Sequence, residues 1–135
     1  MTSHFLDANF VIALEASDDQ HHNEAAHYWS ALIETPFSLV TTSYVLDEVV
    51  TFLNSRRQHD KALRAGNNLL SASHIQMIHV DEVLFYEGWE YFAQHADKTF
   101  SLTDCISFVL MNKLGIAEAL TFDKHFVQAG FKKLP

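Results

Sequence analysis

Short apolar runs alternate with longer helix-like segments along the whole chain, and this alternation strongly restricts the folds available to it. Strands that are separated by helices usually pair in parallel, because each helix returns the chain to the starting edge of the sheet. A parallel sheet needs a helical layer on both faces. We therefore expect an α/β fold, a three-layer α/β/α sandwich with a mainly parallel central sheet of four to five strands. The expected strands cover residues 3–7, 37–41, 75–80, 117–122 and, with the weakest pattern, 131–134.

Helical periodicity fills the intervals between these strands. The helix over 104–114 is expected to be central, because its side chains are apolar on nearly every side. Gly115 offers this helix a C-terminal stop, and Thr42 or Ser43 can cap the helix that contains Glu48. The other expected helices cover residues 9–17, 21–34, 58–73 and 81–95.

The 135 residues are 48% hydrophobic and include eleven phenylalanines, which is enough for a sizeable core. We expect a single domain over residues 1–135. Cys105 is the only cysteine, which excludes an intrachain disulfide and indicates a small buried side chain. Residues 1–4 do not resemble a secretory leader, and no apolar run is long enough to span a bilayer. The expectation is a soluble cytoplasmic protein that does not bind membranes.

The formal net charge of −8 argues against a protein that binds nucleic acid through a broad basic surface. It argues less against a nuclease with a metal centre, because the ion would neutralise part of the negative charge. Four of the nine basic residues fall close together, at Arg56, Arg57, Lys61 and Arg64. This cluster is typical of a solvated helix face, and a contact with phosphate groups is the alternative.

Three aspartates follow apolar runs, at Asp7, Asp104 and Asp123. Each is expected where a buried strand ends or a helix begins, and open α/β sheets bind their ligands at this edge. Two carboxylates about 4 Å apart repel by about 4 kcal/mol at an effective dielectric constant near 20. A divalent cation converts this repulsion into ligation. Together with Glu48, the three aspartates therefore suggest a metal site.

Each aspartate also has a structural explanation. Asp104 can stabilise the positive end of a helix, and Asp123 can cap one. Asp7 can belong to a turn after the first strand. Periodicity does not choose between Asp47 and Glu48, because both flank the apolar stripe of their helix at similar angles.

Four segments together resemble the acidic motifs of the PIN-domain nucleases. They are FLDANFVIAL at 5–14, VLDEVV at 45–50, SLTDCISF at 101–108 and LTFDKHF at 120–126. The resemblance covers nearly the whole chain and is closest to the small single-domain members, the VapC-type toxins of bacterial and archaeal toxin–antitoxin pairs. It implies a PIN-like fold and cleavage of RNA that depends on Mg²⁺ or Mn²⁺. It also implies a homodimer and inhibition by a small cognate antitoxin.

The resemblance assigns roles to the acidic positions of this sequence. Asp7 and Asp104 match the principal metal ligands of the family. Glu48 matches the acid on the third helix, and Asp123 matches the acid after the fourth strand. The resemblance thus selects Glu48 over Asp47 as the fourth member of the site.

Three polar residues beside these acids also match positions of the family. Asn9 matches a position that is commonly Ser, Thr or Asn, and Thr103 and Thr121 match hydroxyl positions. We expect them to orient carboxylates or ordered water, with local capping as the alternative. In the implied reaction a metal ion lowers the pKa of bound water, so no protein nucleophile is required.

Other functions fit these residues less well. A phosphatase with an aspartyl nucleophile would want a second acid two residues after the first, where this chain has Asn9. A receiver-type signalling module would want adjacent acids and a lysine after a strand in another arrangement. A non-toxin PIN nuclease of RNA processing, and a non-catalytic PIN-like scaffold that binds RNA or protein, are the remaining alternatives.

The histidines suggest a rival site. His21, His22 and His27 are poorly spaced for one zinc site on a helix, so surface or capping roles are expected. His125 could approach the acids because it closely follows Asp123, but packing with Phe126 against the sheet is the expected role.

Overall fold

The centre of the fold is a parallel β-sheet, seen in a computed structural model that describes residues 3–135. Among these residues the sheet has five strands in the order β3-β2-β1-β4-β5, and every neighbouring pair is parallel. The expected α/β fold with a mainly parallel sheet is confirmed. The strands are β1 Ser3–Leu6, β2 Ser38–Thr42, β3 Ile75–Ile78, β4 Glu118–Leu120 and β5 Lys132–Leu134.

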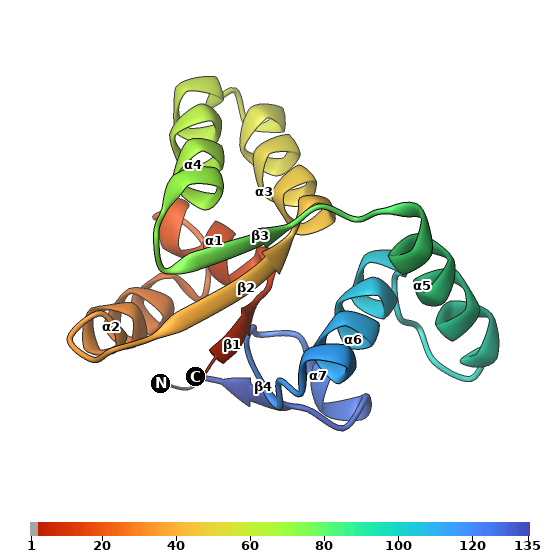
Figure 1. Ribbon diagram of the computed structural model, residues 1–135. Helices are drawn as coiled ribbons and strands as arrows, with labels where there is room; N and C mark the ends of the chain where they lie inside the picture. The colour runs from red at the N-terminus through yellow and green to blue at the C-terminus, as the bar shows by residue number, and fades with distance from the viewer. Residues whose placement is uncertain (1–2) are drawn as a thin grey trace.

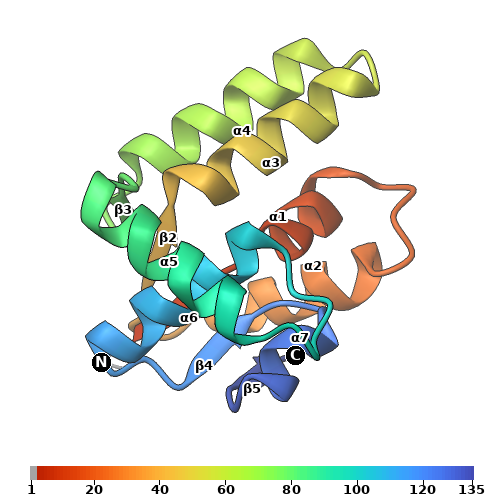
Figure 2. The same cartoon turned by 90° about the vertical axis from the view of Figure 1, so that its right-hand side faces the viewer.

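Helices cover both faces of this sheet (Figures 1 and 2). The chain leaves β1 toward β2 and β3, then returns across the sheet to β4 and β5 on the other side of β1. Because parallel crossovers are right-handed, this reversal places α1–α4 on one face and α5–α7 on the other. The helices are α1 Ala8–Glu15, α2 His22–Leu32, α3 Ser43–Ser55, α4 His59–Ser71, α5 Glu82–Gln94, α6 Leu102–Leu114 and α7 Lys124–Gln128.

The order in which strands are added to the sheet reverses at β1 and β4, which are parallel neighbours although they are far apart in sequence. The backbone N–H of Asp7 donates to the carbonyl of Leu120 at 3.1 Å and joins the carboxyl ends of these strands. In open α/β sheets the crevice outside such a switch point is where ligands bind. The fold therefore places the residues after β1 and β4 at its natural binding edge.

Helix α6 is central, as its nearly uniform apolarity indicated. Cys105, Ile106, Phe108 and Met111 are fully buried in the hydrophobic core, and α6 packs along α5. The helix ends at Gly115, whose φ of +68° is the left-handed conformation expected of a C-terminal stop. Its fixed position matters because its first turn carries an acid of the candidate site.

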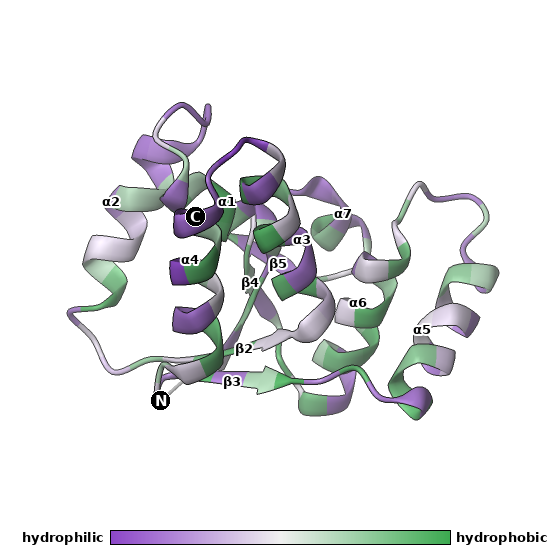
Figure 3. Ribbon diagram, turned by 90° about the horizontal axis from the view of Figure 1, so that it is seen from above, coloured by the Kyte–Doolittle hydropathy of each residue, from purple (hydrophilic) through white to green (hydrophobic). Residues whose placement is uncertain are grey.

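Helix α3 is fixed at its start by a side-chain cap. The Thr42 hydroxyl accepts the backbone N–H of Val45 at 3.2 Å, so the cap expected at Thr42 or Ser43 is provided by Thr42. Val45, Val49 and Leu53 then form the buried stripe. Seen from above, α4 beside it alternates between hydrophilic and hydrophobic residues, as a helix at the surface does (Figure 3). No helix in the described range 3–135 combines the length and apolarity needed to cross a membrane.

Candidate active site

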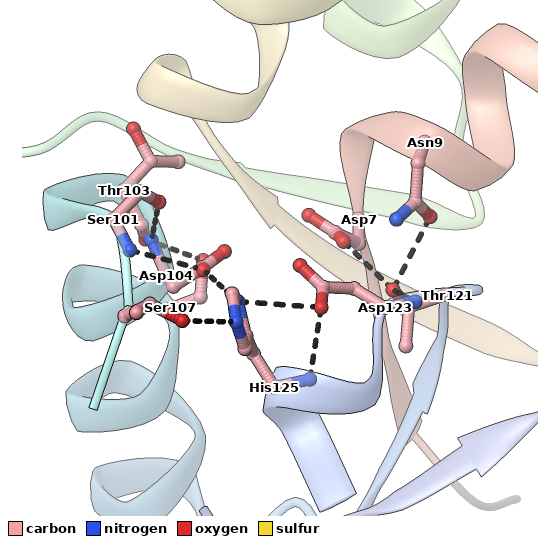
Figure 4. A network of polar contacts seen from close by, with 10 residues as sticks. Asp7, Asn9, Ser101, Thr103, Asp104, Ser107, Thr121, Asp123 and His125 are labelled. Atoms are coloured by element: carbon pink, nitrogen blue, oxygen red, sulfur yellow. Dashed lines mark hydrogen bonds and ion pairs between the residues drawn. The ribbon is translucent and has the colours of Figure 1, made fainter. Parts of the chain in front are cut away.

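The acids predicted from the sequence meet at the carboxyl edge of the sheet. Asp7 directly follows β1, Asp123 lies between β4 and α7, and Asp104 is in the first turn of α6. Their side chains converge on one region in the close view of Figure 4. Glu48 lies on α3, and its charge contributes to the raised pKa of Asp7. Four chain segments thus contribute one acid each to this cluster.

Asp7 is the most buried of these carboxylates, with 5% of the residue exposed. It occupies the N-cap position of α1, yet its side chain makes no capping hydrogen bond. The pKa of Asp7 is raised from the ordinary 3.8 to about 7, chiefly by burial and also by the charges of Asp104 and Glu48, while hydrogen bonds from the Thr121 hydroxyl and the Ala8 backbone act in the opposite direction. A buried acid without a capping role is costly to ionise, and a nearby cation would offset that cost.

Thr121 and Asn9 hold Asp7 in place from the other side. The Thr121 hydroxyl lies 2.8 Å from Oδ2 of Asp7 and 3.2 Å from Oδ1 of Asn9. Oδ1 of Asn9 accepts the backbone N–H of Phe122 at 3.0 Å, and the Thr121 oxygen accepts the N–H of Asp123 at 3.0 Å. These contacts link the end of β4 to Asp7. They suit the orienting role expected of Asn9 and Thr121.

Asp104 does stabilise the start of a helix, as its structural explanation required, and the N-cap residue itself is Ser101. Its backbone N–H donates to the Ser101 hydroxyl at 3.0 Å, and its Oδ2 accepts the Ser101 N–H at 3.2 Å, which completes a capping box. Burial nevertheless raises the pKa of Asp104, and the charge of Asp123 adds to this increase. The Ser101 N–H and His125 act in the opposite direction. Capping and membership of the acid cluster are therefore compatible.

Asp123 also serves two purposes. Its Oδ1 caps α7 by accepting the backbone N–H of His125 at 2.8 Å. The same oxygen lies 3.3 Å from the His125 ring nitrogen Nδ1, which is 3.2 Å from Oδ2 of Asp104. His125 thus lies between the two aspartates instead of packing with Phe126, and its ring meets Phe100 edge to face. The expectation that His125 packs with Phe126 is therefore wrong, and the approach to the acids that its place after Asp123 allowed is what the structure has.

Glu48 and Asp47 differ in what surrounds them. Oδ1 of Asp47 accepts the hydroxyl of Thr51 at 3.2 Å, one turn later on the exposed side of α3. Glu48 is an exposed residue, but partial desolvation of its carboxylate raises the pKa, and the nearby charges of Asp104, Asp47 and Asp123 also raise it. The charges of two acids of the cluster thus affect Glu48, and the choice of Glu48 over Asp47 stays a prediction.

Thr103 contributes a hydroxyl on the α6 side of the cluster. A hydrogen bond from the Thr103 side chain lowers the pKa of Glu48, against the effect of burial. The Thr103 carbonyl accepts the hydroxyl of buried Ser107 at 3.0 Å, one turn later in α6. Thr103 can therefore orient the Glu48 carboxylate, as its position in the sequence suggested.

A divalent cation fits the chemistry of this donor set. Carboxylate oxygens are the ligands that Mg²⁺ and Mn²⁺ prefer, and four carboxylates share one partly buried edge. Within residues 3–135 the tightest potential metal-binding group is Asp104, Asp123 and His125, whose ligand atoms all lie within 4.8 Å of one another. Asp7 and Glu48 border this group, since their charges interact with Asp104.

The other histidines do not assemble a site in the described part of the chain. Nδ1 of His22 lies 2.7 Å from the carbonyl of Ala13, and the ring of His21 stacks on Phe122 at 4.2 Å. His27 is exposed on α2. Their roles agree with the expectation of surface and local structural histidines.

The basic cluster at the connection between α3 and α4 is partly engaged in structure. The Arg56 guanidinium lies over the Phe52 ring at 4.6 Å, with one nitrogen 3.9 Å from an Asp18 oxygen. Nζ of Lys61 donates to the carbonyl of Glu15 at 2.8 Å and so neutralises the C-terminal end of α1. Arg57 and Arg64 are exposed, and together with Lys61 they line a shallow surface pocket.

Comparison with known proteins identifies relatives over nearly the entire chain. The family model described as PIN domain matches residues 4–132. A protein named 23S rRNA-specific endonuclease VapC20, from two strains of Mycobacterium tuberculosis, is 35% identical over 127 residues, which are 94% of each chain.

Solved structures also match nearly the whole chain. The crystal structure of Mycobacterium tuberculosis VapC20, described as a sarcin-ricin loop cleaving toxin, matches with a TM-score of 0.85 at 34% identity. That match covers 94% of this chain and 95% of the other. The structure of VapBC2 from Rickettsia felis bound to a DNA fragment from its promoter matches with a TM-score of 0.71 at 10% identity, over 98% of both chains, and shows a shared fold.

Proposed function

This chain belongs to the PIN-domain family, and on that premise we propose that it is an endoribonuclease that acts as the toxin of a type II toxin–antitoxin pair. Its 35% identity to an endonuclease named VapC20, over 94% of both chains, supports this activity. The single observation that carries the proposal is Asp7. It is a buried acid with a pKa raised to about 7, with no capping role and with two further carboxylates near enough to affect it.

The acid cluster is proposed as the site of Mg²⁺ or Mn²⁺. Asp7, Asp104 and Asp123 would hold the cation, with Glu48 as a direct or water-mediated ligand. A cation bound there supplies Lewis-acid chemistry, because it withdraws charge from a phosphodiester and makes water more acidic. The raised pKa values of Asp7, Glu48 and Asp104 support the proposal, since all three acids would gain from a nearby positive charge.

The surrounding residues are proposed to orient these acids. The Thr121 hydroxyl fixes one oxygen of Asp7, and Asn9 fixes the backbone that leads into Asp123. Thr103 does the same for Glu48. Such contacts keep carboxylates in the geometry that a cation requires. Because water is the attacking group in this proposal, the residue two positions after Asp7 can be an amide, where an aspartyl phosphatase would want a second acid.

The sarcin-ricin loop of 23S rRNA is the first substrate to test, because the relative is described as cleaving it. Purified protein should cut a synthetic RNA of this loop when Mg²⁺ or Mn²⁺ is present and should not cut it in EDTA. Asp104→Asn keeps the side-chain volume but removes a ligand charge, so it should abolish cleavage. Asp47→Asn is the matched control on the exposed side of α3 and should retain cleavage. Equal cleavage by Asp104→Asn and wild type would contradict the proposal.

The proposal extends to partners and organisation. We infer that residues 1–135 form one nuclease domain, that the protein works in the cytoplasm, and that a small cognate antitoxin inhibits it. We also infer a homodimer. The outer face of α5 supports a protein contact, because Tyr86 and Trp89 are 59% and 51% exposed and Val83 is 63% exposed. Sedimentation of the purified protein, and of Trp89→Ser, tests the homodimer.

Two alternatives lead to different results. A non-toxin nuclease of RNA processing would cleave RNA with the same cluster but would not arrest growth when expressed without an antitoxin. A non-catalytic scaffold would bind RNA or protein without metal-dependent turnover. Expression of wild type and Asp104→Asn in a bacterial host distinguishes the toxin, which should arrest growth only with Asp104 intact.

A further inference from the structure

We propose that His125 is a metal ligand, and that its nitrogen makes this site prefer a first-row transition cation such as Mn²⁺ or Co²⁺ to Mg²⁺. The proposal rests on the proposed function, because it concerns the cation of the same acid cluster. It adds a nitrogen ligand to the four acids that the family resemblance assigns to the site.

The positions of the three donor atoms carry the proposal. Nδ1 of His125 lies 3.2 Å from Oδ2 of Asp104 and 3.3 Å from Oδ1 of Asp123. Neighbouring ligand atoms around an ion with ligand distances of about 2.0–2.2 Å lie about 2.9–3.5 Å apart, in octahedral or tetrahedral geometry. All three donor atoms lie within 4.8 Å of one another, so this group could hold one cation. Figure 4 shows the His125 ring between the two carboxylates.

The other ring nitrogen is anchored as in a metal-binding histidine. Nε2 of His125 lies 3.1 Å from the Thr99 hydroxyl. A ligating histidine usually donates its second N–H to a nearby oxygen, which fixes the tautomer and turns the lone pair toward the metal. With the proton on Nε2 donated to Thr99, the lone pair of Nδ1 faces the carboxylates of Asp104 and Asp123.

Two further contacts hold His125 in place. The backbone N–H of His125 donates to Asp123, and its ring meets the Phe100 ring edge to face with centroids 5.5 Å apart. The side chain is 19% exposed, so it keeps access from the open side of the cluster. A preorganised imidazole beside two preorganised carboxylates requires little rearrangement to bind an ion.

The nitrogen donor decides which cation binds best. Mg²⁺ prefers oxygen ligands and keeps several waters, whereas imidazole suits transition cations. Affinity for a mixed nitrogen and oxygen site rises from Mn²⁺ to Co²⁺ and Ni²⁺. A cluster of carboxylates alone would discriminate less between Mg²⁺ and these ions.

The test reads the ligand directly, independently of RNA cleavage. Pulsed EPR of Mn²⁺ bound to the wild-type protein should show hyperfine coupling to one directly bound ¹⁴N nucleus. His125→Asn should lose this coupling, and its dissociation constant for Co²⁺, measured by calorimetry, should rise by at least about tenfold. Its dissociation constant for Mg²⁺ should change little. His27→Asn, on the exposed side of α2, is the matched control and should leave both measurements unchanged.

The outcomes separate this proposal from the proposed function. Bound Mn²⁺ without nitrogen coupling in the wild type, or coupling that persists in His125→Asn, would overturn the role of His125 even if RNA cleavage continued. Failure of wild type both to bind Mn²⁺ and to cleave RNA would overturn the metal-dependent nuclease itself. If His125→Asn does not fold, the wild-type spectrum alone decides. Labelling the histidines with ¹⁵N should then replace the ¹⁴N hyperfine coupling of bound Mn²⁺ with ¹⁵N coupling.

Discussion

The carboxylate of Asp7 is subject to two opposing requirements. The core packs around it and removes water, which favours its protonated form, and metal binding requires the ionised form. Asp104 and Glu48 increase the conflict, because their charges also disfavour a second anion. The fold accepts this cost at a position where the side chain caps no helix. Such a cost is typical of a residue retained for function.

Asp7→Asn should be more stable than wild type at pH 8 in EDTA. The folded-state pKa of Asp7, about 7, lies above its ordinary value of 3.8, so stability from Asp7 is complete below pH 3.8 and is lost as pH rises through 7. The variant lacks this loss, and its advantage in the free energy of unfolding should grow to as much as about 4 kcal/mol at pH 8. Urea denaturation at pH 4 and pH 8 measures the difference.

Mn²⁺ should make the wild-type protein more stable than Asp7→Asn. A cation that binds only the folded state stabilises it by RT ln(1 + [L]/Kd), and Asp7→Asn should gain much less from it than wild type. Melting temperatures with and without Mn²⁺ show the effect. A variant that is less stable in EDTA and gains as much from Mn²⁺ would indicate a purely structural Asp7.

Glu48→Gln should lower kcat/KM for RNA by about 10- to 100-fold, whereas Asp47→Asn should leave it nearly unchanged. The two acids are adjacent in sequence, but Asp47 accepts a hydrogen bond from Thr51, whereas the charges of Asp104 and Asp123 raise the pKa of Glu48. Steady-state cleavage by both variants tests this assignment. Equal losses would place Asp47 in the site as well.

Part of this site was accessible from sequence and part was not. The acids could be predicted because each ends an apolar run, and a strand or helix end is a local property. The contact of His125 with Asp104 joins residues that are 21 positions apart, and no periodicity encodes it. The only available signal was the position of His125 two residues after Asp123.

At the scale of helices and strands, the starts of helices position the chemistry. Thr42 caps α3, Ser101 caps α6 and Asp123 caps α7, so three of the segments that carry acids have fixed first turns. These caps are local and could be predicted from the sequence. Helix α7 spans only five residues, too few to produce a helical pattern, so its extent could not be predicted.

Gly88→Ala should separate α5 from α6 and destabilise the protein by about 1–3 kcal/mol. A Cβ atom at Gly88 would lie 3.2 Å from Cα of Ile106, and it would overlap the Ile106 side chain. Gly66→Ala is the matched control, because its Cβ would meet only a Val50 methyl at 3.1 Å and alanine favours the helix. Thermal unfolding compares the two. A Gly88 variant as stable as the Gly66 variant would show that the α5–α6 contact is loosely packed.

At the scale of the whole molecule, a net charge of −8 must be reconciled with a polyanionic substrate. The acid cluster accounts for some of this charge, and a bound cation would offset it. Four of the nine basic residues lie at or near the α3–α4 connection, where Arg57 and Arg64 are exposed while Lys61 contacts α1. RNA can therefore be attracted to this end of the molecule without a broad basic surface.

Replacing Arg57 and Arg64 together with alanine should weaken RNA binding and flatten its salt dependence. Loss of two phosphate contacts would reduce the slope of log K against log salt by about 1.4 for single-stranded RNA. Fluorescence anisotropy at several salt concentrations measures the slope. Lys132→Ala, on the edge strand β5, is the control and should retain it. An unchanged slope in the double variant would identify the basic cluster as a solvated helix face.

A crystal structure with Mn²⁺, read by anomalous scattering, is the most direct test of the proposed cation site. The acids of that site follow β1 and β4 and lie on α3 and α6. We predict an anomalous peak within ligand distance of Asp104 and Asp123 and adjacent to Asp7. The peak should disappear in Asp104→Asn. The absence of a peak at this edge of the sheet, at a Mn²⁺ concentration that supports RNA cleavage, would contradict the assignment of these acids as the metal centre.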